Sequence, residues 1–184
     1  MGIRAPAAIQ HRRAGGRTWA AITPQTCGRY NRTVTEAAKE EITLSRVFDA
    51  SPELVYRAFV DPDQLCLWFG AEGFSVPCES VQIDARPGGF QRFVLMSDAD
   101  PVVRSRVDVT FAQVVENELL AGHREVEEAP GSRVMLRLEF HQEAPGKTRL
   151  DLRQGPYTEE RGEVTKAGWD SSFVRLDSLL RRSL

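Results

Sequence analysis

The sequence predicts an α+β domain in which a curved antiparallel sheet of about seven strands packs against one long C-terminal helix. Short stretches of alternating apolar and polar residues recur between residues 41 and 153, separated by turn sequences rich in Gly, Pro, Asp and Asn. After them, one apolar stripe at helical spacing runs from about 158 to 182. A twisted sheet with a single apolar face needs a cover, and this helix is long enough to provide one.

The predicted domain opens with a strand and two short helices. Residues 42–48 alternate apolar and polar side chains, which is typical of a strand with one solvent-exposed face. Ser51-Pro52 indicates a helix start, because serine caps helix N-termini and proline is favoured at the first helical position. Asp61-Pro62 ends that helix and begins a second one, whose apolar positions are Leu65, Trp68 and Phe69.

Six further stretches predict strands joined by short turns. The first, residues 74–83, contains Pro77, so we expect a bent or edge strand there. The other five are residues 90–96, 103–115, 119–126, 134–140 and 148–153. Turn sequences such as Ala129-Pro130-Gly131 separate them, which favours an antiparallel meander with one buried face.

The last predicted element is the helix from about Thr158 to Arg182, which follows the sheet-ending Gly155-Pro156. Its apolar face consists of Trp169, Phe173, Leu176 and Leu180, at spacings of four, three and four residues. The indole N–H of Trp169 needs an acceptor when buried. We therefore interpret Trp169 as a core anchor first and a ligand contact second.

Charge divides the chain into two parts. Residues 1–39 carry seven basic residues and one acidic residue, and we expect a disordered basic extension, with organelle targeting or charge contacts as alternatives. Subtracting these from totals of 24 basic and 26 acidic residues leaves 17 and 25 in residues 40–184, a net charge of −8. An acidic domain matches nucleic acid poorly, so no nucleic-acid partner is expected.

Membrane and secretion signals are weak, and the cysteines predict a reducing environment. No apolar run approaches the roughly 18 residues of a membrane span, and no secretory signal is evident. Cys27, Cys66 and Cys78 are odd in number and widely spaced. We therefore expect a cytoplasmic protein in which Cys66 and Cys78 are small core residues and not disulfide partners.

The sequence offers no local motif for catalysis, metal or cofactor. His11, His123 and His141 are not at helical spacing from one another or from a cysteine, and no Gly-x-Ser-x-Gly elbow occurs. Gly88-Gly89 reads as a turn because no Gly-Lys-Ser/Thr follows it. We expect a protein that is not an enzyme and has no cofactor. The enzymatic alternative uses Asp108, His123 or His141.

A ligand cavity is expected between the sheet and the C-terminal helix. Asp108 and Thr110 line it only if the alternating residues Val107, Val109 and Phe111 face outward. A buried aspartate would need a partner, which could be Arg92, Arg104 or Arg106. The aromatic candidates equally predict a closed core. The candidate cavity residues are Trp68, Phe69, Phe74, Phe93, Asp108, Thr110, His141, Trp169 and Phe173.

Three groups of residues resemble a known family. One group resembles the opening of the family's domain and consists of Pro52, Val55, Ala58, Phe59, Asp61-Pro62, Leu65 and Trp68-Phe69-Gly70. Another, Asp84-Ala85-Arg86-Pro87-Gly88-Gly89, resembles its turn between early strands. The third resembles its closing helix and consists of Gly168-Trp169, Phe173, Leu176 and Leu180. The family is that of the activator of heat-shock protein 90 ATPase homologues, and the resemblance covers about Glu41 to Leu184.

The resemblance implies the helix-grip fold of the START or birch-pollen-allergen-like superfamily and an association with stress response. Superfamily members bind lipids, sterols, hormones or polyketides, and a few are cyclases or hydrolases. The eukaryotic name-giver activates a chaperone ATPase, but it has an extra N-terminal domain that the first 40 residues here are too short and polar to replace. We expect non-catalytic binding of a small hydrophobic ligand, either a lipid or an aromatic metabolite. The alternatives are a chaperone-activator-like protein-interaction module and a polyketide cyclase or hydrolase.

Overall fold

The computed structural model describes residues 40–126 and 131–182, which form an eight-stranded antiparallel sheet with three α-helices. The predicted basic extension, residues 1–39, lies outside the described residues. The α-helices are α1 (Pro52–Val60), α2 (Pro62–Trp68) and α3 (Glu159–Leu180). The strands are β1 (Glu40–Phe48), β2 (Phe74–Ser75), β3 (Gln82–Ile83), β4 (Phe90–Ser97), β5 (Arg104–Val115), β6 (Leu119–Glu125), β7 (Arg133–Ala144) and β8 (Lys147–Tyr157). The helix-grip fold predicted from the sequence is confirmed.

The sheet has the strand order β1-β8-β7-β6-β5-β4-β2, and β3 also pairs with β4. Strands β4 to β8 form consecutive hairpins, and β1 completes the sheet by pairing with β8. The predicted strand at 74–83 is divided into β2 and β3 by a short 3-10 helix, η1 (Cys78–Ser80). Pro77 caps η1 and has no amide hydrogen to donate to a strand ladder, which explains the break.

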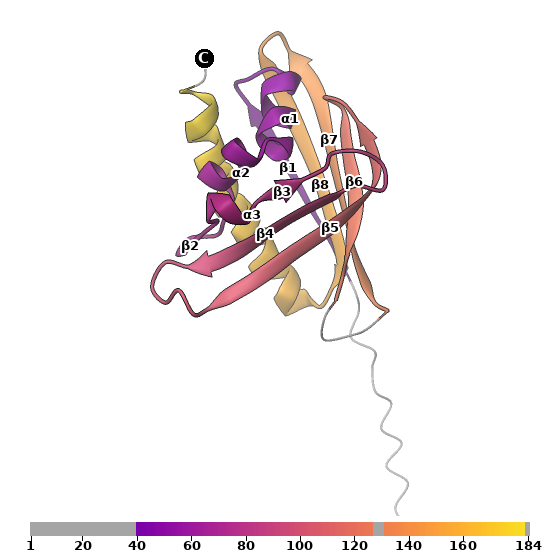
Figure 1. The fold of residues 1–184 in the computed structure, drawn as a ribbon. Helices are drawn as coiled ribbons and strands as arrows, with labels where there is room; N and C mark the ends of the chain where they lie inside the picture. Colours follow the sequence, from indigo (N-terminus) through magenta and orange to yellow (C-terminus); the bar gives the residue numbers. More distant parts are fainter. Residues whose placement is uncertain (1–39, 127–130, 183–184) are drawn as a thin grey trace, which may run out of the picture. The chain divides into compact units, whose positions relative to one another are not determined.

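The two faces of the sheet differ in polarity. On β7, Leu136, Leu138 and Phe140 are buried beneath the helices, and the alternating Met135 and His141 are exposed. All three helices lie against the buried face, with the long α3 along it (Figure 1). We call this the inner face and the opposite one the outer face. The alternation predicted from the sequence therefore sets which side chains meet the helices.

Helix α3 is capped and held to the sheet by polar contacts as well as by apolar packing. Thr158 caps its N-terminus by accepting a hydrogen bond from the Arg161 amide at 3.4 Å. Asp177 forms an ion pair with Arg46 of β1. The guanidinium of Arg175 donates to the Phe74 carbonyl at 2.9 Å. Phe74, one of the candidate cavity residues, is thereby tied to α3 through its backbone.

A disulfide joins Cys66 of α2 to Cys78 of η1, so the expectation that these cysteines are unpaired is wrong. They are separated by 12 positions, and the chain between them folds back so that their Cα atoms lie 5.1 Å apart. Spacing alone could not show this approach, because it depends on the loop that leads to Pro77. No helix in the described part of the chain is both long enough and apolar enough to cross a membrane.

Candidate ligand-binding site

The candidate aromatic residues lie at the centre of the core. Phe69 makes edge-to-face contacts with Trp68, Phe93 and Trp169, at centroid distances of 5.4, 4.9 and 5.2 Å. Phe173 continues the cluster from Trp169 at 5.5 Å. Trp68 is fully buried, and Phe93 and Phe173 are nearly so. These five residues contact one another, and none of them lines either of the two clefts described below.

Both core indoles have protein acceptors. Trp68 Nε1 donates to the Ala58 carbonyl at 2.9 Å, and Trp169 Nε1 donates to Gln154 Oε1 at 2.8 Å. A buried indole N–H needs such a partner. The hydrogen-bonding needs of both indoles are therefore met by the protein itself. This is the arrangement expected of a core that anchors α2 and α3.

A cleft of about 870 Å³ lies beside this core, where β5 and β6 separate. Their last pair toward this end is Thr110 with His123, and both residues line the cleft. A β-bulge between Phe111 and Gln113 precedes the separation, and bulges increase the local twist. Gly122 allows the strands to approach closely there, because a Cβ at this position would lie 2.3 Å from the Thr110 carbonyl oxygen. We call this space the β5–β6 cleft.

The register settles where Asp108 and Thr110 point. Val109 and Phe111 are buried on the inner face, so Asp108 and Thr110 belong to the outer side of β5 and reach the cleft from there. Both carboxylate oxygens of Asp108 accept from Arg92 Nε at 3.0 Å. Arg106 lies 3.9 Å away. Asp108 is therefore an ion-paired wall residue.

Five arginines line the β5–β6 cleft against two carboxylates. The arginines come from β4, β5, β6, β7 and the first turn of α3, and they are Arg92, Arg106, Arg124, Arg133 and Arg161. Glu125, the second carboxylate, pairs with Arg133 at 2.7 Å. The formal charge of these lining residues is 5 − 2 = +3 with His123 neutral. The local charge is thus opposite in sign to that of residues 40–184 as a whole.

The cleft also has an apolar wall. Val126, Val134, Pro156 and Tyr157 line it, and Val134 and Tyr157 are almost fully buried. They belong to the ends of β6, β7 and β8 and to the start of the connection into α3. An apolar wall beside a cationic one suits a ligand with an apolar body and a polar end.

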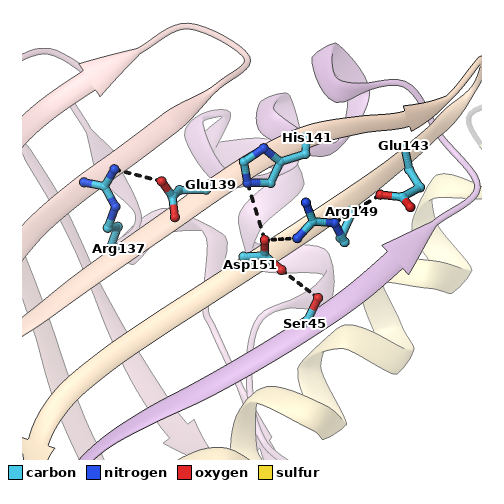
Figure 2. A network of polar contacts seen from close by, with 7 residues as sticks. All are labelled: Ser45, Arg137, Glu139, His141, Glu143, Arg149 and Asp151. Carbon is cyan, nitrogen blue, oxygen red and sulfur yellow. Dashed lines mark hydrogen bonds and ion pairs between the residues drawn. The ribbon is translucent and has the colours of Figure 1, made fainter.

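His141 is exposed on the outer face, where it belongs to a polar network (Figure 2), and it does not line the β5–β6 cleft. Its Nε2 is 3.4 Å from Asp151 Oδ2, and Ser45 donates to Asp151 Oδ1 at 2.6 Å. Arg149 bridges Asp151 and Glu143, and Arg137 pairs with Glu139 at 2.8 Å nearby. His141 also lines a second cleft of about 710 Å³ near the β5–β6 turn.

The trio of Ser45, His141 and Asp151 lacks the geometry of a nucleophile relay. The Ser45 hydroxyl donates to the Asp151 carboxylate, and His141 contacts the same carboxylate. In a relay the imidazole stands between hydroxyl and carboxylate so that it can take the hydroxyl proton. Here the carboxylate is in the middle, and the trio acts as a cross-strand contact between β1, β7 and β8.

The outer-face network predicts a pH-dependent contribution to stability. Burial acts to raise the pKa of Asp151, but hydrogen bonds from Ser45 and Arg149 and the nearby positive charges outweigh it and hold the pKa below its ordinary value. A lowered folded-state pKa stabilises the protein above the unfolded value of roughly 3.9, and this contribution is lost as the pH falls through the folded value. We expect Asp151→Asn to be less stable than wild type at pH 7, with the gap narrowing below about pH 4. Thermal unfolding between pH 7 and 3 measures this gap.

The control for this variant is Asp170→Asn, on the exposed side of α3, which is expected to leave stability at pH 7 unchanged. A gap between Asp151→Asn and wild type that stays constant down to pH 3 would show that the Asp151 charge does not contribute as inferred.

Within the described residues, no group of three or more His, Cys, Asp or Glu side chains is arranged to hold a metal ion. Sequence reasoning anticipated Arg92 and Arg106 as possible partners of Asp108, and it missed Arg124, Arg133, Arg161 and Tyr157. Arg124 had a visible signal, since it continues the inner-face series Leu120, Gly122, Arg124 of β6 and is a charged residue at an inner-facing position. Arg133 and Arg161 come from separate elements and gave no local signal.

Comparisons with known proteins agree with this architecture. Residues 49–181 match the family described as "Activator of Hsp90 ATPase homolog 1-like protein". No curated protein matches the chain. Protein CV1439 from Chromobacterium violaceum is similar in structure, with 27% sequence identity, a TM-score of 0.67, and coverage of 76% of this chain and 96% of that chain. The AHSA1 protein from Silicibacter pomeroyi is 21% identical with a TM-score of 0.66, covering 79% of this chain and 100% of that chain.

Proposed function

This chain belongs to the Activator of Hsp90 ATPase homolog 1-like family, and from that premise we propose that it binds a small hydrophobic ligand without catalysing a reaction. The ligand is a lipid or an aromatic metabolite, and it occupies the β5–β6 cleft, where the sheet meets the first turn of α3. The observation that carries the proposal is the cleft itself, with a volume of about 870 Å³ and an apolar wall. Small-molecule sites typically measure roughly 300–1,000 Å³.

The placement of the candidate acid–base residues supports binding over catalysis. Asp108 and His123 line the β5–β6 cleft, whereas His141 lies on the outer face, so the three do not converge on one point. Both carboxylate oxygens of Asp108 are already engaged by the Arg92 guanidinium at 3.0 Å. Among the described residues, these three candidates form no assembled acid–base pair that would favour a cyclase or hydrolase.

Filling the cleft is expected to weaken binding. Thr110 is exposed and stands at the point where β5 and β6 separate, so an indole in its place would occupy the space. We expect Thr110→Trp to weaken the binding of decanoate, a lipid-like probe, and of 1-naphthoate, an aromatic probe, by at least about tenfold. Isothermal titration calorimetry measures both affinities.

Thr43→Trp is the matched control, because Thr43 is an exposed threonine on the outer side of β1 and does not line the cleft. This variant is expected to bind both probes like wild type. The proposal is rejected if neither probe binds wild type, or if both variants bind equally well. Wild type saturated at about 100 times the dissociation constant should gain about 2.7 kcal/mol of stability.

The alternative of a chaperone-activator-like module has one structural observation in its favour. The connection between β4 and β5 exposes two adjacent valines, Val102 at 84% and Val103 at 52%. Apolar side chains at a projecting turn are a feature of docking surfaces. Stimulation of a chaperone ATPase that is lost in a Val102→Ser, Val103→Ser variant would favour this function, and an unstimulated ATPase would reject it.

A further inference from the structure

The β5–β6 cleft is cationic within an acidic domain. Its described lining residues carry a formal charge of +3, whereas residues 40–184 carry −8. A cleft of one sign with low-dielectric walls concentrates ligands of the opposite sign. The charge pattern therefore bears on which hydrophobic ligands the cleft selects.

Two of the five cleft arginines, Arg124 and Arg161, take no part in the ion pairs described for the cleft. Arg92 and Arg106 both face Asp108, and Arg133 pairs with Glu125. Neither Arg124 nor the Arg161 side chain forms an ion pair with a carboxylate of the described residues. Two guanidinium groups in one cleft are thus available to a ligand.

The position of Arg124 makes an unpaired charge costly. It is half-buried at an inner-facing position of β6, and its cross-strand partner is Val134, which is 3% exposed. A guanidinium beside apolar side chains has lost part of its hydration. A bound anion compensates for this loss through charge-assisted hydrogen bonds.

Arg161 approaches the cleft from the other side. It lies in the first turn of α3, next to Thr158 and Tyr157, which also line the cleft. The N-terminal end of this 22-residue helix carries partial positive charge, which Glu159 and Glu160 of the same turn offset, but neither of these two carboxylates lines the cleft. The apolar wall of Val126, Val134, Pro156 and Tyr157 lines the same cleft as both arginines.

We infer that the β5–β6 cleft takes an amphipathic anion, whose carboxylate or phosphate is held by Arg124 and Arg161 and whose apolar body lies on the apolar wall formed by Val126, Val134, Pro156 and Tyr157. This inference rests on the proposed function, because it names the headgroup of the ligand that the cleft binds. Arginine suits both headgroups, since its planar fork donates two parallel hydrogen bonds to either oxyanion.

The test compares probes that share a ten-carbon chain and differ in headgroup. Decanoate, decyl phosphate, decanol and decyltrimethylammonium are titrated below their micellar concentrations into the full chain, with inorganic phosphate as a tail-free arm. Both alkyl anions are expected to bind at least about tenfold more tightly than decanol, and decyltrimethylammonium more weakly. The better of the two alkyl anions identifies the headgroup class.

Variants then assign the effect to residues. Arg124→Gln and Arg161→Gln are each expected to weaken binding of the alkyl anions about tenfold and to leave decanol unchanged. Arg153→Gln removes the same charge from an exposed outer-face position of β8 and is expected to change nothing. Unfolding curves of all three variants confirm that they are folded.

The possible outcomes separate the inference from the proposed function. Equal affinity for the anions and decanol, or anion binding that survives both substitutions, overturns the inference and leaves the proposed function in place. Failure of all alkyl probes to bind overturns the proposed function as well. If inorganic phosphate binds as tightly as decyl phosphate, the cleft is an anion site, but the inference that its ligand is amphipathic is overturned.

Discussion

Replacing Trp68 with alanine is expected to lower the free energy of unfolding by about 4 kcal/mol. Trp68 is 0% exposed, and its ring lies 4.8 Å from that of Phe59 and 5.4 Å from that of Phe69. Truncation leaves a cavity between α2 and the sheet and removes the donor to the Ala58 carbonyl. Urea unfolding followed by far-ultraviolet circular dichroism measures the change without relying on the removed indole.

Leu67→Ala is the matched control for this prediction. Leu67 is the preceding residue on α2 and is 60% exposed, so the expected change is below about 0.5 kcal/mol. The free energy of unfolding of Trp68→Phe should lie between those of the two alanine variants, because phenylalanine keeps an aromatic ring and loses the indole hydrogen bond. If Trp68→Ala were as stable as Leu67→Ala, the aromatic cluster would not be the packed core described above.

Removing the Cys66–Cys78 disulfide is expected to destabilise the domain by about 3 kcal/mol. The bond closes a loop with a sequence separation of 12, and opening it restores conformational freedom mainly to the unfolded chain. The double variant Cys66→Ser, Cys78→Ser should therefore unfold at lower urea than wild type. Reduced wild type should behave like the double variant.

The double variant is also the control, because its unfolding should not respond to reductant. Cys27 is retained in both proteins, so any effect of that thiol cancels in the comparison. A reductant that leaves wild-type stability unchanged after both thiols have been shown to react with an alkylating agent would contradict this prediction.

The fold was readable from the sequence because its determinants are local. The alternation on β7 predicts which side of the strand faces inward, and the spacing of Trp169, Phe173 and Leu176 does the same for α3. The structure buries the predicted side in both elements. Pro77 also predicted an irregular strand, but the sequence pattern did not predict the 3-10 helix between β2 and β3. Local periodicity thus predicted elements and faces, but not the loop path that joins Cys66 to Cys78.

The site was less predictable because it depends on how strands diverge. Aromatic residues such as Trp68 and Phe93 were natural candidates for a cavity wall, and the structure packs them together in the core. The cleft instead arises where β5 leaves β6 after the Thr110–His123 pair, and it collects side chains from five strands and the start of α3. Asp108 and Thr110 were candidates from the sequence and do line the cleft, and Arg124, a charged residue in an inner-face series, was a further signal.

The central claim is that the β5–β6 cleft, and not the aromatic core, receives the ligand. The most direct measurement is a titration of isotope-labelled protein with decanoate, followed by amide and indole N–H chemical shifts. We expect chemical-shift changes at Thr110, His123 and residues 157–161, with the Trp68 and Trp169 indole signals unmoved, because both indoles are already hydrogen-bonded inside the protein. Shifts centred on the two indoles, with the cleft residues unmoved, would contradict it.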